Sequence, residues 1–141
     1  MADDIILSLT GTVGKKDYGY AVLIPKVPIK LLLNQRIAKF IDVDGNKITR
    51  PFLLYLVKSE LFLDMLYASA NGTRQANLST VEIKKFLISL PPIELQKEFC
   101  EKLDKLKSHC IKLEANYQTK LSALDELRQS LLQKAFAGEL T

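Results

Sequence analysis

Residues 93–137, IELQKEFCEKLDKLKSHCIKLEANYQTKLSALDELRQSLLQKAFA, decide the fold of this chain. The stretch contains neither proline nor glycine, the two residues that most often end a helix. At about 1.5 Å per residue, a helix of this span is on the order of 65 Å long. We therefore predict one uninterrupted helix that begins after Pro91-Pro92 and ends near Gly138.

Large apolar residues recur along this helix in steps of mostly four and three, the heptad period of helices that pack side by side. Arg128 interrupts the series between Leu124 and Leu131. Steps of four, four and three from Leu113 to Leu124 locally unwind a left-handed supercoil, so the helix should be nearly straight there. The predicted helix-pairing surface consists of Phe99, Leu103, Leu106, Cys110, Leu113, Tyr117, Leu121, Leu124, Leu131 and Ala135.

Burying these side chains favours a partner for the helix. At roughly 1.5–3 kcal/mol for each large apolar side chain, burial of the series contributes an upper bound of about 15–30 kcal/mol. The alternative is a helical hairpin that folds on itself, but no Gly, Pro or Asn-Gly turn stands where a hairpin needs one. We expect a partner helix, from a second copy or from another subunit. Leu127, Leu132 and Phe136 widen the apolar stripe near the C-terminus.

Before Pro92 the chain reads as a small mixed domain. Apolar and β-branched runs are separated by turn signals such as Thr10-Gly11-Thr12-Val13-Gly14 and Asp44-Gly45-Asn46. We predict an α+β fold: a mixed head at residues 1–92, followed by one long coiled-coil helix at residues 93–141. Within the head, the patterns predict strands at 4–9, 20–24, 35–43 and 87–90, a helix at 51–70, and a short helix after the capping-box pattern at 79–82.

Composition excludes several classes of protein. Of the 141 residues, 48% are hydrophobic and 26% are charged, which is too apolar for a disordered chain. The apolar runs fall far short of the ~18 residues of a membrane span, and the acidic start Met-Ala-Asp-Asp is unlike a signal peptide, so we expect a cytoplasmic protein. Cys100 and Cys110 lie too far apart along one helix to form a disulfide, so we expect buried or free thiols.

The positive charge is concentrated in the head. Residues 1–92 hold 12 Lys and Arg against 8 Asp and Glu, a difference of +4, whereas residues 93–141 hold 8 against 8, a difference of zero. This asymmetry is typical of a polyanion-binding head on a neutral helical stalk, although many ordinary domains carry a similar excess.

The segment Gly11-Thr12-Val13-Gly14-Lys15-Lys16 superficially resembles a phosphate-binding loop, but its spacing is wrong. The motif requires glycine where this chain has Leu9, and Ser or Thr where it has Lys16. Backbone amides and hydroxyls beside two lysines can still hold nucleic-acid phosphates, and a plain turn is the alternative.

Other groups of polar residues point to no catalytic or metal site. His109 is the only histidine and has no triad pattern around it. The acidic pairs Asp3-Asp4 and Asp42 with Asp44 lie at predicted strand edges or turns, where solvated Asp is common. The polar loop at 71–77 contains Arg, Gln and Asn, which read guanine and adenine edges, although an ordinary connector is also polar.

Five segments in the same order along the chain resemble the specificity subunit of type I restriction-modification systems. They are DIILSLTGTVGK at 4–15, LNQRIA at 33–38, GTRQANLS at 72–79, LPPI at 90–93 and LRQSLLQKAFAGEL at 127–140. Together they extend over nearly the whole chain.

The resemblance implies that residues 1–92 are part of a domain that reads duplex DNA, the family pattern beginning midway through that domain. It implies that residues 93–141 pair with a second specificity-type helix, from the same or another specificity subunit, and dock the modification (methyltransferase) and restriction subunits. Catalysis is expected in those subunits, and no cofactor or metal is expected here. The positions that match the family and are candidates for facing DNA are Thr10, Thr12, Lys15, Asn34, Gln35, Arg36, Thr73, Arg74, Gln75 and Asn77.

The missing part of the recognition domain motivates a second hypothesis. In this alternative the chain acts as a truncated assembly or decoy partner that pairs through its helix without reading DNA.

Overall fold

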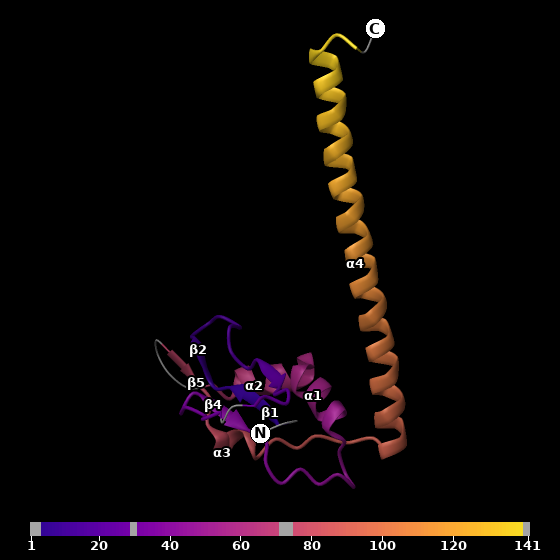
Figure 1. The fold of residues 1–141 in the computed structure, drawn as a ribbon. Helices are drawn as coiled ribbons and strands as arrows, with labels where there is room; N and C mark the ends of the chain where they lie inside the picture. The colour runs from indigo at the N-terminus through magenta and orange to yellow at the C-terminus, as the bar shows by residue number, and fades with distance from the viewer. Residues whose placement is uncertain (1–3, 29–30, 71–74, 140–141) are drawn as a thin grey trace. The chain divides into compact units, whose positions relative to one another are not determined.

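The computed structural model describes residues 4–28, 31–70 and 75–139 (Figure 1). The chain divides into two compact units, Met1–Cys100 and Glu101–Thr141. Small antiparallel sheets and short helices form most of the first unit, and a long C-terminal helix supplies the second. The predicted α+β class is confirmed.

A three-stranded antiparallel sheet lies at the centre of the first unit. Strand β1 (Ile5–Ser8) is the middle strand, between β3 (Ala21–Leu23) and β4 (Ile37–Lys39). Leu7 pairs with Ala21 on one side and with Ala38 on the other. The alternation of β1, with Ile5 and Leu7 buried, directs one face of the sheet into the core.

A second, two-stranded antiparallel sheet pairs β2 (Thr10–Thr12) with β5 (Gln75–Asn77). The sequence prediction was wrong for residues 10–12, which it assigned to a turn, and for residues 75–77, which it assigned to a loop, while residues 71–74 lie outside the described chain. Only Val13 and Gly14 form the turn, and they follow β2 directly. The ladder joins segments far apart in the sequence, so no local pattern in either segment indicates it.

The predicted helix at 51–70 is two helices, α1 (Arg50–Lys58) and α2 (Glu60–Ala68). Ser59 has an extended backbone and caps both helices. Its backbone N–H and its hydroxyl donate to the Leu56 carbonyl, and its hydroxyl oxygen accepts from the Phe62 N–H at 3.3 Å. One serine therefore ends the first helix and starts the second.

The remaining predictions for the head had mixed outcomes. Strands β1 and β3 and the short helix α3 (Thr80–Ile83) confirm three of them, the last with Ser79 as its N-cap. The strand predicted at 35–43 shortens to β4, because residues 35–36 form a turn and Asp42 has a left-handed φ of 54°. No strand forms at 87–90, although Ile88 packs against the core.

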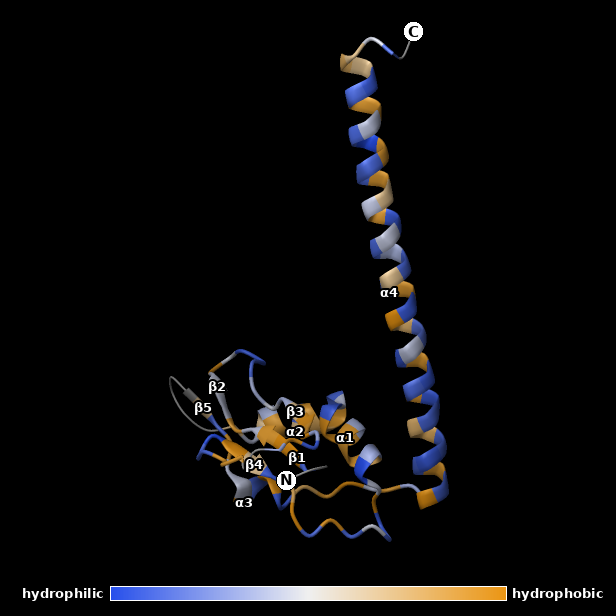
Figure 2. Cartoon of the chain, in the orientation of Figure 1, coloured by the Kyte–Doolittle hydropathy of each residue, from blue (hydrophilic) through white to orange (hydrophobic). Residues whose placement is uncertain are grey.

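The core of the first unit draws on both sheets and on α1 and α2. Figure 2 shows its apolar ribbon segments in orange. Tyr18 and Tyr67 meet edge to face, with ring centroids 5.0 Å apart. The buried apolar residues are Ile5, Leu7, Leu9, Tyr18, Ala21, Leu53, Val57, Phe62, Leu66, Ala76 and Leu78.

Helix α4 (Ile93–Phe136) is continuous over 44 residues, as predicted. Every residue from Asp104 to Glu139 is exposed, and orange and blue alternate along the helix in Figure 2. Cys100 is buried and Cys110 is exposed, and no disulfide joins these two described cysteines, as expected. Among the described residues, no helix combines the length and the hydropathy needed to cross a membrane.

Gln96 fixes the first turns of α4 within the first unit. Its side chain is fully buried and satisfies three backbone groups from two other segments. The amide oxygen accepts from the Thr49 N–H at 2.9 Å, and the amide nitrogen donates to the Lys47 and Pro91 carbonyls, each at 2.8 Å. Phe99, one turn later, packs edge to face against Phe52 of α1.

We predict that Gln96→Ala lowers the free energy of unfolding by about 2–4 kcal/mol, because it removes three hydrogen bonds to backbone groups that a fully buried side chain makes. Urea denaturation followed by tyrosine fluorescence measures this change. Gln118→Ala, at an exposed position of the same helix, is the matched control and should change stability by less than about 0.5 kcal/mol. Equal effects of the two substitutions would refute the role given to Gln96.

Candidate nucleic-acid interface

The backbone of Leu9 brings three of the family-like segments together. Its N–H donates to the Arg36 carbonyl at 2.8 Å, and its carbonyl accepts from the Leu78 N–H at 2.9 Å. Leu9 is also the single residue between β1 of the three-stranded sheet and β2 of the two-stranded sheet. The candidates at 10–15, at 34–36 and at 75–77 therefore lie around one buried residue.

The β2–β5 pair has one inward and one outward side. Gly11 is paired with Ala76, which is buried, and directly opposite residues share a face of a ladder. Thr10 is paired with Asn77, and these residues belong to the other face, where Asn77 is exposed. Asn77 already has a partner within the chain. This outward face is the first part of the candidate surface.

Asp17 holds the end of β2 through Thr12. Its carboxylate accepts from the Thr12 backbone N–H and from the Thr12 hydroxyl, each at 2.7 Å. The backbone hydrogen bond from Thr12 is the main cause that lowers the pKa of Asp17, so this exposed carboxylate is ionised at neutral pH. Both hydrogen-bond donors of Thr12 are therefore occupied within the chain.

This arrangement corrects one detail of the sequence interpretation. We had expected the amides and hydroxyls of the Thr-Gly-Thr segment to be available to phosphates. At Thr12 both donors serve Asp17, whose negative charge also repels phosphate. The prediction for Thr12 as a phosphate donor is weakened by this geometry, although its position on the surface stays exposed.

Two lysines follow the turn after β2, and their side chains make different contacts. The Lys15 N–H donates to the Thr12 carbonyl at 3.1 Å, which closes the turn and leaves the exposed Lys15 side chain outside any ion pair in the described chain. Lys16 lies 3.4 Å from Asp64 and 5.3 Å from the centre of the Tyr67 ring. Lys15 is thus the cation of this turn that can neutralise a phosphate.

The segment at 34–36 forms a second exposed turn. The Asn34 side-chain oxygen accepts from the Arg36 N–H at 2.9 Å, an arrangement typical of an Asx turn. Gln35 and Arg36 are exposed, and the Arg36 guanidinium forms no ion pair with the described residues. Lys15 therefore lies just after the end of β2, and Arg36 is joined to Leu9, the residue before its start.

The remaining candidates are placed only in part. Thr73 and Arg74 lie outside the described residues. The backbone of Gln75 pairs with Thr12 in the β2–β5 ladder. Sequence reasoning missed Asp17, because a single Asp after two lysines carries no local sign that its carboxylate binds a threonine on a preceding strand.

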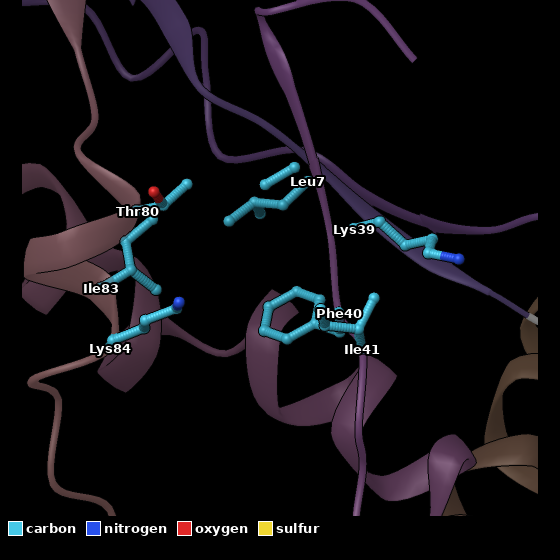
Figure 3. Close-up of a pocket in the computed structure, with 8 residues that line it drawn as sticks. Leu7, Lys39, Phe40, Ile41, Thr80, Ile83 and Lys84 are labelled. Carbon is cyan, nitrogen blue, oxygen red and sulfur yellow. The ribbon is translucent and has the colours of Figure 1, made fainter. Parts of the chain in front are cut away.

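A separate hollow lies between β4 and α3 (Figure 3). Its volume is about 190 Å³, and Leu7, Phe40 and Ile83 line its apolar wall. Lys39 lines it too, but its amine already binds Asp4 at 3.2 Å. Within the described part of the chain, no group of three His, Cys, Asp or Glu residues can hold a metal ion. The hollow offers a surface for apolar contact rather than a set of reactive groups.

Comparison with known proteins identifies similar sequences. Residues 2–123 match the family model of the type I restriction modification DNA specificity domain. The chain is 26% identical over 139 residues to the type I restriction enzyme EcoBI specificity subunit of Escherichia coli, which covers 99% of this chain and 28% of that protein.

Two further relatives come from other organisms. The StySPI specificity subunit of Salmonella potsdam is 30% identical over 102 residues, which is 70% of this chain and 22% of the relative. The MjaVIII specificity subunit of Methanocaldococcus jannaschii is 33% identical over 102 residues, 71% of this chain and 23% of the relative. The match thus spans between 22% and 28% of the length of these relatives.

We predict that Gly11→Ala disrupts the β2–β5 end of the surface. A Cβ at position 11 would lie 2.5 Å from both the Asp17 carboxylate and the Tyr18 ring, and the overpacking should lower the free energy of unfolding by about 1–3 kcal/mol. Gly45→Ala is the matched control, because a Cβ there meets no atom within 4 Å. Urea denaturation of both variants checks this expectation, and an unchanged Gly11→Ala midpoint would contradict it.

Proposed function

The chain belongs to the type I restriction modification DNA specificity family, and from this premise we propose that its first unit binds duplex DNA as part of a specificity subunit. The relatives are named specificity subunits of restriction enzymes, and their role is recognition rather than catalysis. Cleavage and methyl transfer then belong to the restriction and modification subunits with which the complete protein assembles. A cytoplasmic location is part of the same proposal.

One observation carries the proposal most directly: the convergence of three family-like segments on Leu9. The two hydrogen bonds of its backbone hold the β2–β5 pair close to the turn at 34–36. Lys15 and Arg36 supply cations without internal partners in the described chain, which suits contact with phosphates. Gln35 and Asn77 supply exposed amides, the side chains that pair with adenine in the major groove.

Binding of a fluorescein-labelled duplex of random sequence, measured by anisotropy between ~50 and ~200 mM salt, tests the proposal. We expect binding that weakens steeply as salt rises. Lys15→Ala should lower affinity about equally for all sequences and reduce the slope of log K against log salt by about 1, because one phosphate contact is lost.

Lys107→Ala, at an exposed position of α4, is the control for the loss of one positive charge. Its salt slope should match that of the unmodified protein. Substitution of a base-reading candidate such as Arg74→Ala should instead reduce discrimination between sequences. Equal effects of Lys15→Ala and Arg74→Ala on every duplex would count against the division into positioning and reading residues.

We further propose that α4 pairs with a second specificity-type helix, from another copy or another specificity subunit. Large apolar side chains remain exposed along the series, including Leu106 at 59%, Tyr117 at 63% and Leu124 at 61%. Leu103 is half-buried, while Cys110 and Ala135 are exposed. Apolar exposure repeated at this spacing is typical of a surface that functions in contact with another helix.

Sedimentation equilibrium tests pairing between copies. We expect the chain to self-associate and Leu113→Asp to shift it toward monomer, because the substitution buries a charge in the contact. Ala115→Asp, on the opposite side of the helix, costs a comparable amount of helix propensity and should leave association unchanged. A monomer at every concentration would refute self-pairing and leave a different specificity subunit as the partner.

The alternative function, an assembly or decoy partner that does not read DNA, remains a distinct proposal. It rests on the exposed α4 series. Folded protein that self-associates but binds no duplex at either salt concentration would favour it over DNA recognition.

A further inference from the structure

Asp17 and Thr12 form an exposed hydrogen-bonded pair at the end of β2. The two carboxylate oxygens of Asp17 accept hydrogen bonds from different groups of Thr12, one from the backbone N–H and the other from the hydroxyl, both at 2.7 Å. Both residues are exposed. The orientation of the carboxylate is therefore fixed by two short bonds, although water can reach it.

The unit offers acceptors and no donors. The Thr12 hydroxyl proton points to Asp17, so the oxygen that remains can only accept a hydrogen bond, and the ionised carboxylate can only accept as well. A DNA phosphate also carries only acceptors and a negative charge, so it is repelled here. An exocyclic amino group of a base, which carries donors, fits the same unit.

Resting on the DNA binding proposed above, we propose that the Asp17–Thr12 pair reads an exocyclic amino group, N4 of cytosine or N6 of adenine, in the major groove. Each base pair presents one such amino group there, and carboxylates accept hydrogen bonds from it. The pair should therefore prefer A or C over G or T at one position of one strand. Guanine and thymine would place a carbonyl oxygen against the carboxylate.

Neighbouring residues hold the Asp17 carboxylate in position and favour its ionised form. The absence of a side chain at Gly11 lets Asp17 lie close over β2, since a Cβ there would be 2.5 Å from a carboxylate oxygen. Lys15 contributes a favourable charge to the ionised form, and its own side chain stays available to a phosphate. Tyr18, buried directly after Asp17, fixes the chain on the other side.

A purely structural role for Asp17 predicts something different. If the carboxylate only stabilised the turn, replacing it would weaken binding to all duplexes together, because the whole surface would loosen. If it reads a base, discrimination is lost at a single position while the rest of the preferred sequence is kept. Removal of its negative charge should also raise affinity for duplexes that lack that sequence.

The test is selection of bound duplexes from a randomised pool, followed by affinity measurements on the selected sequence and its single-position variants. Four full-length proteins are compared: unmodified, Asp17→Asn, Thr12→Val and Asp42→Asn. Asn at position 17 keeps the size but can donate as well as accept. Asp42→Asn makes the same chemical change at an exposed loop residue whose left-handed φ asparagine tolerates.

We expect the unmodified protein to select a particular base pair at one position, and Asp17→Asn to reduce discrimination there by roughly tenfold. Thr12→Val should give a smaller loss at that same position, and Asp42→Asn none. Circular dichroism melting of each variant confirms that it is folded. An unfolded Asp17→Asn protein would move the comparison to Thr12→Val, which keeps the backbone bond to Asp17.

The outcomes separate this inference from the proposed function. A selected sequence that Asp17→Asn and Thr12→Val leave unchanged, or weaken evenly at all positions, overturns the base-reading role and leaves DNA recognition standing. Folded protein that selects no sequence and shows no salt-dependent binding overturns both.

Discussion

The backbone of Leu9 is the connection on which the proposed recognition surface depends. Its N–H and carbonyl bind two segments that are distant in the sequence, near Arg36 and near Leu78. Because these peptide groups lie beside a buried side chain, leaving them unpaired would be costly, and the pairing is therefore strongly favoured. These two bonds connect the turn at 34–36 and the residue that follows β5 to the link between β1 and β2.

Gln96 performs the corresponding task for the start of α4. Backbone hydrogen bonds stabilise a helix of 44 residues along its length, but they do not attach its first turns to the head. The buried amide of Gln96 makes that attachment by binding the backbone at Thr49, Lys47 and Pro91. Thr49 is also the N-cap of α1, so the starts of the two helices share one hydrogen-bonded junction.

Cations and hydrogen-bond acceptors on the first unit are suited to different contacts with DNA. Lys15 and Arg36 provide charge without internal partners in the described chain, which favours positioning on a phosphate backbone. Asp17 and Thr12 provide fixed acceptors close to Lys15. A surface with cations and a held carboxylate side by side is suited to discrimination, because attraction to phosphate alone carries no sequence information.

The sequence by itself determined α4, the capped α3, two strands of the central sheet and the family, because these depend on local periodicity, on capping residues and on short segments in a fixed order. Helical hydrogen bonds join residues four apart, so their pattern is visible in a short window. Only the tertiary structure decided the β2–β5 ladder, the break at Ser59 and the Asp17–Thr12 pair. The ladder joins residues distant in the sequence, and the other two depend on side-chain hydrogen bonds whose geometry the residue type alone does not fix.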